Sequence, residues 1–315
     1  MNHGLPGRED GTERRIEVMR SFRSLLYAPG DQRRLIEEAA SSAADALIFD
    51  LEDRVPMDRK AAARSTIREY IERLKKHKVI YVRVNSLASG MLREDLDAVM
   101  VDGLEGIRIP KVDSPETVKA VDTVVSEVER THGLPPGKIQ FCLGLESARA
   151  VYLAYEMCSA SRRVSSLAPG LGRGGDLQTD MAYLWSEEGT ETLYIRSKVV
   201  LAARAAGIPI PLDGAYGNSR GYDPSREEAG LIRSAQLGRQ LGYRAKICLF
   251  PSQAEHINRI FVPTLQEINF SRRVLDAYEA GLAQGSATAS VDGTLIDDTQ
   301  ATDARRILSW AEGAA

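Results

Sequence analysis

Two acidic residues, Glu146 and Asp176, each stand shortly after an apolar, strand-like run, thirty residues apart. Residues 141–145 precede Glu146, and residues 164–169 lead into a glycine-rich loop, 170–175, that ends at Asp176. Carboxylates on successive strand ends of a parallel barrel can converge on one cation. Mg²⁺ prefers about one or two protein carboxylates, with water or substrate oxygens completing its octahedron. The pair therefore indicates a metal-dependent enzyme. The alternative is that Glu146 caps a helix and Asp176 lies in a turn.

Further charged side chains end neighbouring strand-like runs. Asp50, Glu52 and Asp53 end the second run, Arg83 and Asn85 the third, and Lys111 the fourth. Working residues of a (β/α)₈ barrel cluster at the carboxyl ends of its strands. We therefore expect an acidic group to face Arg83 and Lys111 across one mouth, which suits a cation and a carboxylate substrate bound side by side. Taken singly, Asp53 could instead pair with Arg54 or cap a helix, and Lys111 could be solvated.

The elements that must position these residues alternate regularly between strands and helices. Eight strands are expected at 24–29, 46–51, 79–84, 106–112, 139–145, 164–169, 208–212 and 246–250. Amphipathic helices follow, for example after Ser114, a helix N-cap with proline at the first helical position. This alternation and the apolar strands predict a (β/α)₈ TIM barrel. A doubly wound sheet is the alternative, although no G-x-G-x-x-G opens the first strand–helix turn.

Three segments are expected along the chain. Residues 1–20 are polar and charged and indicate a disordered leader, and residues 21–275 form the barrel. Residues 276–315 form a C-terminal lid or arm that contains a Gly/Ser/Ala-rich hinge at 285–290 and a last helix at 302–311.

Composition restricts the class of protein. The hydrophobic content of 43% and charged content of 27% are ordinary for a globular protein, and the net charge of −3 argues against a nucleic-acid partner. Three scattered cysteines predict free thiols in a reducing, cytoplasmic setting. No run approaches the roughly 20 apolar residues of a membrane helix, so no membrane partner is expected.

Six ordered motifs resemble a known family. They are Arg23–Gly30, Asp50–Val55, Val82–Asn85, Ile109–Val112, Leu145–Arg149 and Gly174–Asp176. Their order is similar to that of the citrate lyase beta subunit and the malyl-CoA and citramalyl-CoA lyases. The likeness runs from about Arg23 to the tail.

The resemblance implies a Mg²⁺-dependent lyase that forms or cleaves a carbon–carbon bond in a 3-hydroxyacyl-CoA such as malyl-CoA, citramalyl-CoA or citryl-CoA. Its small-molecule partners would be an acyl-CoA and a 2-oxo acid, and its assembly a homotrimer or a multiple of it. Glu146 and Asp176 would bind the metal, and Glu52 and Asp53 would act through metal-bound water. Asp297, in a Gly-x-x-Ile-Asp lid motif, would work in the active site of an adjacent subunit. The implied substrate-binding residues are Arg23, Arg83, Lys111 and Gly175.

Three positions depart from the family pattern and keep other functions open. Phe250 stands where the family has histidine, Arg173 lies in the glycine loop, and Asp298-Thr299 follows Asp297. One alternative is a citrate lyase beta subunit that acts on acyl-carrier-protein thioesters. A second is a catalytically silent barrel that binds 2-oxo acids, which Phe250 favours and Asp297 opposes. A third is a CoA-independent aldolase, which the tail from Val291 argues against.

Overall fold

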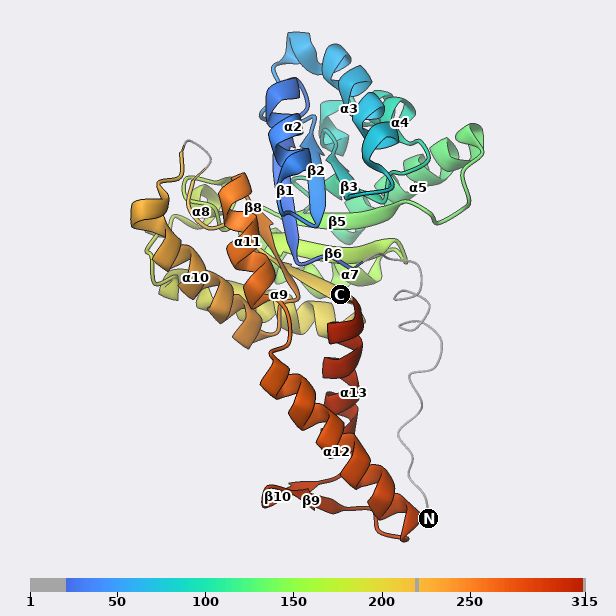
Figure 1. The fold of residues 1–315 in the computed structure, drawn as a ribbon. Coiled ribbons are helices and arrows are strands. Elements are labelled where there is room, and N and C mark those ends of the chain that lie inside the picture. Colours follow the sequence, from blue (N-terminus) through green and yellow to red (C-terminus); the bar gives the residue numbers. More distant parts are fainter. Residues whose placement is uncertain (1–20, 219–220, 314–315) are drawn as a thin grey trace. The chain divides into compact units, whose positions relative to one another are not determined.

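The computed structural model describes residues 21–218 and 221–313, and the leader expected at 1–20 lies outside these residues. The chain divides into two compact units, Met1–Asn258 and Arg259–Ala315. Strands β1 to β8 belong to the first unit and form a closed parallel barrel, in which β1 pairs with both β2 and β8 (Figure 1). The (β/α)₈ prediction is therefore confirmed, and the doubly wound sheet is excluded.

The barrel strands follow the expected apolar runs closely. They are β1 Ser24–Pro29, β2 Ala46–Asp50, β3 Val79–Arg83, β4 Gly106–Ile109, β5 Gln140–Leu145, β6 Val164–Pro169, β7 Ile210–Asp213 and β8 Ala245–Cys248. A cluster of buried side chains that includes Leu25, Ile48, Tyr81 and Leu212 joins residues of these strands into one core. The strands are buried along nearly their whole length, which is why they read as continuous apolar runs.

The helices of the first unit surround this barrel (Figure 1). They are α2 Arg33–Ser41, α3 Lys60–Leu74, α4 Leu92–Val99, α5 Pro115–His132, α6 Ala148–Tyr152, α7 Ala154–Ser159, α8 Asp176–Met181, α9 Leu193–Ala205, α10 Pro224–Leu241 and α11 Pro251–Ile260, the last of which runs across the division between units. Short 3₁₀ turns lie at Met57–Arg59, Leu87–Ser89 and Thr190–Thr192. The expected cap of α5 is confirmed, because the Ser114 hydroxyl accepts a hydrogen bond from the amide of Thr117.

The second unit is a helical hairpin with a small sheet. Helix α12, Leu265–Ala283, begins with a capping box made by Thr264 and Glu267 and packs against α13, Asp298–Gly313. Between them lies an antiparallel pair, β9 Ala289–Val291 and β10 Thr294–Ile296, joined at Asp292-Gly293. Both turn residues have positive φ (53° and 79°), which is the I′ geometry that Asp-Gly favours. Helix α12 thus continues through the expected boundary at 275/276, and part of the expected hinge is strand.

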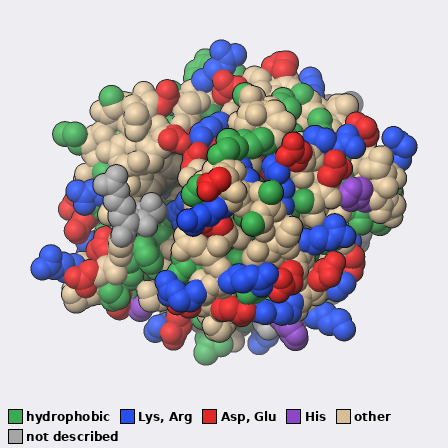
Figure 2. Space-filling view, turned by 90° about the horizontal axis from the view of Figure 1, so that it is seen from above, with side chains coloured by type: hydrophobic (Ala, Val, Ile, Leu, Met, Phe, Trp, Pro, Cys, Tyr) green, Lys and Arg blue, Asp and Glu red, His purple; other side chains and the backbone are tan. Residues whose placement is uncertain are grey.

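No helix in the described parts of the chain is long and apolar enough to cross a membrane. On the face drawn in Figure 2, lysine and arginine side chains alternate with aspartate and glutamate rather than gathering into one field of a single sign. This mixture agrees with the near-neutral net charge.

Candidate active site

A cavity of about 150 Å³ lies where the barrel strands end. The charged side chains among its described lining are Arg54, Arg83, Arg108, Glu146 and Asp176. Tyr27 of β1 and the loop after β6 complete the polar part of the wall, and Ile247 and Leu249 supply apolar surface. A cavity of this size has room for a small organic acid.

Arg83 is fixed by a buried carboxylate on the neighbouring strand. It stands opposite Asp50 in the β2–β3 register, and its Nε and Nη2 lie 2.7 and 2.6 Å from the two carboxylate oxygens. Asp50 is completely buried and also accepts the amide hydrogens of Glu52 and Arg54, which shapes the turn after β2. Burial raises the pKa of Asp50, but the charge and hydrogen bonds of Arg83 outweigh burial and hold that pKa below its usual value. Asp50 therefore stays ionised and orients Arg83.

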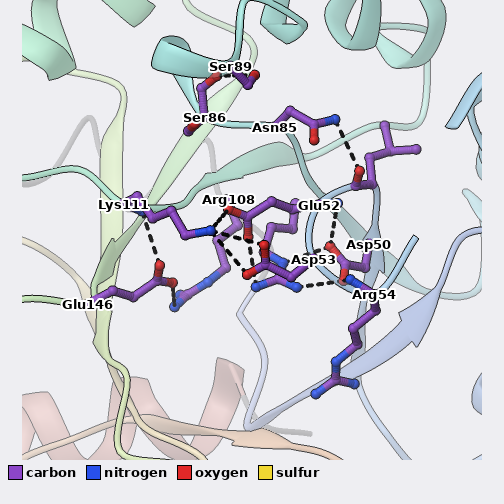
Figure 3. A network of polar contacts seen from close by, with 12 residues as sticks. Asp50, Glu52, Asp53, Arg54, Asn85, Ser86, Ser89, Arg108, Lys111 and Glu146 are labelled. Atoms are coloured by element: carbon purple, nitrogen blue, oxygen red, sulfur yellow. Dashed lines mark hydrogen bonds and ion pairs between the residues drawn. The ribbon is translucent and has the colours of Figure 1, made fainter. Parts of the chain in front are cut away.

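Glu52 bridges two cations beside the cavity (Figure 3). Its carboxylate lies 3.0 Å from Nη1 of Arg83 and 2.9 Å from Nζ of Lys111, which also contacts Asp53 at 3.0 Å. Burial raises the pKa of Glu52 to about 7, against the opposing effect of Arg83 and Lys111, while Glu146 and Asp53 raise it further. Glu52 can therefore hold or release a proton near neutral pH.

A buried lysine supports the turn that carries Glu52. Nζ of Lys60 donates to the carbonyl oxygens of Leu51 and Glu52 at 2.6 and 3.0 Å, and to Oδ1 of Asn85 at 2.8 Å. The amide group of Asn85 in turn donates to Asp95. Because Lys60 is only 6% exposed, these bonds are shielded from water and hold the turn in one conformation.

Glu146 follows β5 and contacts Arg108 of β4 and Lys111 of the turn after β4. Its Oε2 accepts the backbone amide hydrogen of Lys111 at 3.1 Å, and its Oε1 lies 3.7 Å from Nη2 of Arg108. Lys111 makes this contact with a left-handed backbone, φ 51°, which is unusual for a residue other than glycine. Burial raises the pKa of Glu146 and Asp176 adds to the rise, whereas Arg108 and Arg83 lower it.

Asp176 begins α8 after the glycine loop and lines the same cavity as Glu146. Gly144 leaves room for Glu146, because a Cβ there would lie 2.8 Å from Oε1. Within the described residues, no three His, Cys, Asp or Glu side chains are grouped as a metal cage. A pair of carboxylates that face one small polar cavity nevertheless fits Mg²⁺, which keeps several water or substrate ligands.

The structure brings most of the predicted site residues together at one mouth: Glu52, Asp53, Arg83, Lys111, Glu146, Gly175 and Asp176. It does not bring Arg23 there. Arg23 precedes β1, at the opposite edge of the barrel, and its guanidinium pairs with Asp45 just before β2. The interpretation of Arg23 as a substrate-binding residue is therefore corrected: it ties together the amino ends of two strands.

Three other singled-out residues have defined surroundings. Asp297 belongs to the second unit, where its carboxylate accepts the amide hydrogen of Thr299 at the start of α13. Phe250, in place of the expected histidine, stacks on Tyr222 with ring centroids 5.8 Å apart. The guanidinium of Arg173 lies over the Trp185 ring at 5.4 Å. Phe250 and Arg173 are thus each packed on an aromatic ring.

Sequence reasoning missed Arg54, Arg108 and Lys60. Arg108 stands between Ile107 and Ile109 in β4, so a lone cation within an apolar strand was the available signal. Arg54 was considered only as a partner of Asp53, yet it lines the cavity. Nothing local distinguishes Lys60 from a solvated helix residue, because its burial depends on the turn that packs over it.

Comparisons with known proteins identify relatives of this chain. Residues 23–251 match the model of the family described as HpcH/HpaI aldolase/citrate lyase. Citrate lyase subunit beta of Escherichia coli is 32% identical over 93% of this chain and 94% of its own length. The (3S)-malyl-CoA thioesterase of Cereibacter sphaeroides is 32% identical over 93% and 96%. A citrate lyase beta subunit from M. tuberculosis, solved with oxaloacetate and magnesium, superposes with a TM-score of 0.58 at 25% identity, over 78% of this chain and 99% of that one.

Proposed function

Because the chain belongs to the HpcH/HpaI aldolase/citrate lyase family, we propose that it is a Mg²⁺-dependent carbon–carbon lyase acting on 3-hydroxyacyl-CoA thioesters. Candidate substrates are malyl-CoA, citramalyl-CoA and citryl-CoA, which yield an acyl-CoA and a 2-oxo acid. The observation that carries the proposal is the small cavity that Glu146, Asp176 and the fixed cation Arg83 line together. The two carboxylates suit a divalent metal, and the cation suits a carboxylate.

Glu146 and Asp176 would hold the metal, and the relative solved with magnesium supports this choice of ion. Bound there, Mg²⁺ would supply Lewis-acid stabilisation of charge on substrate oxygens. Arg83 would bind the substrate carboxylate through the Nη hydrogens that Asp50 and Glu52 leave free, since a guanidinium has five donors. Lys111 and Asp53 keep Glu52 in place against Arg83.

Cleavage requires the 3-hydroxyl group to lose its proton as the bond between the α- and β-carbons breaks. The electron pair passes to the α-carbon of the thioester, which must then take up a proton, while the β-carbon becomes the carbonyl of the 2-oxo acid. Glu52, whose pKa is about 7, lies close enough to the cavity to buffer the first proton through water. We assign the second proton transfer to Asp297, on the strength of its position in the lid motif.

The assignment of Asp297 implies an oligomer, in which the lid of one subunit closes the barrel of another, and we propose a homotrimer. Asp297→Asn should lower turnover by roughly two to four orders of magnitude while metal binding stays intact. Mixing this variant with Glu146→Gln chains should restore part of the activity, because some oligomers then pair an intact barrel with an intact lid. No recovery after verified subunit exchange would contradict a lid that acts between subunits.

A product assay tests the reaction type. The protein is incubated with each of the three CoA esters, with Mg²⁺ or EDTA, and products are separated by mass. A lyase gives acetyl-CoA and a 2-oxo acid, only with the metal, and not with the Glu146→Gln variant. Free CoA with an intact hydroxy acid would instead indicate a thioesterase, the activity in the name of the C. sphaeroides relative. Absence of acetyl-CoA from every ester would contradict the proposal.

A further inference from the structure

The side chain of Arg54 is a cation without an acidic partner in the described part of the chain. Its guanidinium lies 5.2 Å from the ring centroid of Tyr27, and it has no ion pair or side-chain hydrogen bond among the described residues. In Figure 3 it points away from the cluster formed by Glu52, Asp53 and Lys111, and no dashed line reaches its guanidinium. The other two arginines of the cavity differ, since Arg83 is paired with Asp50 and Glu52, and Arg108 lies near Glu146.

Arg54 is also placed beside a like charge. Arg83 stacks on the same Tyr27 ring at 5.3 Å, so both guanidinium groups border one end of the cavity. Burial lowers the pKa of Arg54 and the neighbouring charge of Arg83 lowers it further, and the opposing effects of Asp50 and Tyr27 compensate this cation only in part. An arginine nevertheless stays charged at neutral pH. A partly buried, incompletely compensated cation that lines a cavity favours an anionic ligand group.

Binding of a metal would make the charge of the protein groups that remain around the cavity more positive. Glu146 and Asp176 would neutralise Mg²⁺, and Glu146 would then compensate Arg108 less than it does in this structure. Asp50, Glu52 and Asp53 remain against four cationic groups: Arg54, Arg83, Arg108 and Lys111. The excess is positive, and it grows when Glu52 takes up a proton. One substrate carboxylate, bound by Arg83, does not use Arg54.

We propose that Arg54 binds a second carboxylate of the substrate, so that the protein prefers 2-oxo dicarboxylic acids, and the hydroxyacyl-CoA esters derived from them, over monocarboxylic ones. This specificity rests on the function proposed above. We assign the second carboxylate to the acid rather than to a CoA phosphate, because Arg54 lines the same small cavity as Arg83, Glu146 and Asp176 and lies against the same Tyr27 ring as Arg83. Two guanidinium groups that lie 5.2 and 5.3 Å from one ring centroid can each bind one carboxylate of a short dicarboxylate.

Binding of malate and lactate tests the inference without turnover. These acids share the 2-hydroxy carboxylate and differ by one carboxylate. Calorimetry with Mg²⁺ should show malate binding on the order of tenfold more tightly than lactate to the parent protein. Arg54→Gln should weaken malate binding on the order of tenfold and change lactate binding by less than about twofold. Arg54→Lys, which keeps the charge but loses the fork, should fall between them.

The matched turnover experiment compares oxaloacetate with pyruvate in condensation with acetyl-CoA, and Arg54→Gln should lower the ratio of their kcat/KM values on the order of tenfold. Equal loss of malate and lactate binding, no preference in the parent, or an unchanged acid ratio with a raised KM for acetyl-CoA would each overturn the inference. Malate preference that depends on Arg54 in a protein without any lyase activity would support this anion site while contradicting the proposed function.

Discussion

Glu52 is a buried carboxyl group between two cations, and replacing it with glutamine should change how stability depends on pH. Its side chain is 6% exposed and contacts both Arg83 and Lys111. Burial raises its pKa from 4.5 to about 7 in spite of these cations. Folding therefore strengthens proton binding at Glu52, and the favourable contribution of this proton is present below pH 4.5 and lost as pH rises through 7.

The magnitude follows from the size of the shift. A rise of the Glu52 pKa from 4.5 to about 7 is converted at about 1.36 kcal/mol per pKa unit. The contribution of Glu52 to the free energy of unfolding is therefore lower by about 3 kcal/mol at pH 8 than at pH 4.5. Glutamine is neutral throughout this range and keeps a carbonyl oxygen to accept from Lys111. The free energy of unfolding of Glu52→Gln minus that of the parent should therefore rise with pH by about 3 kcal/mol.

Urea denaturation with EDTA, repeated from pH 4.5 to pH 8, measures this difference. Glu37→Gln is the control, because hydrogen bonds from Arg73 and Tyr70 lower the pKa of the exposed Glu37. That carboxylate is ionised in both states above pH 5, so its difference from the parent should stay flat there. A flat profile for Glu52→Gln as well, or one that falls with pH, would refute the reasoning about Glu52.

Three further substitutions test the site. Arg83→Lys should lower kcat/KM on the order of tenfold or more, because lysine cannot keep the two bonds to Asp50 and also bind substrate; activity equal to the parent would exclude this role. Lys60→Met removes three buried hydrogen bonds and leaves Oδ1 of Asn85 without a donor, while the carbonyls of Leu51 and Glu52 keep their bonds from Asn85 and Val55; urea denaturation should show a loss of about 1–3 kcal/mol, and an unchanged midpoint would contradict the support described for the turn. Gly144→Ala puts a Cβ 2.8 Å from Oε1 of Glu146 and should weaken Mg²⁺ binding in calorimetry while costing about 1–3 kcal/mol of stability; parent-like affinity would show that Glu146 can move freely.

Much of the barrel could be predicted because its strands are buried on both faces and stand out as apolar runs between amphipathic helices. The rule that functional groups follow parallel strands also located the mouth, since Glu146 and Lys111 come after β5 and β4. Arg23 was predicted against this rule, because it precedes β1 and must therefore lie at the opposite edge. The prediction for Arg23 rested on the resemblance to a family motif and took no account of the direction of β1.

The remaining features depend on tertiary packing or on local signals that were overlooked. The capping box of Thr264 and Glu267 and the Asp292-Gly293 turn are both visible in the sequence, but the first lies in the segment predicted as barrel and the second in the segment predicted as lid or arm. The role of Arg54 could not be predicted in the same way. Its lack of a partner becomes apparent only when the groups around the cavity have been paired.

The central claim is that Glu146 and Asp176 form one divalent-metal site at the barrel mouth. Electron paramagnetic resonance with Mn²⁺, a substitute for Mg²⁺, measures this directly by counting bound ions per subunit. The account predicts one site in the parent protein, competed by Mg²⁺, and its loss in both Glu146→Gln and Asp176→Asn, while Asp297→Asn keeps it. Unchanged Mn²⁺ binding in the double variant Glu146→Gln/Asp176→Asn, with the fold intact, would contradict the claim.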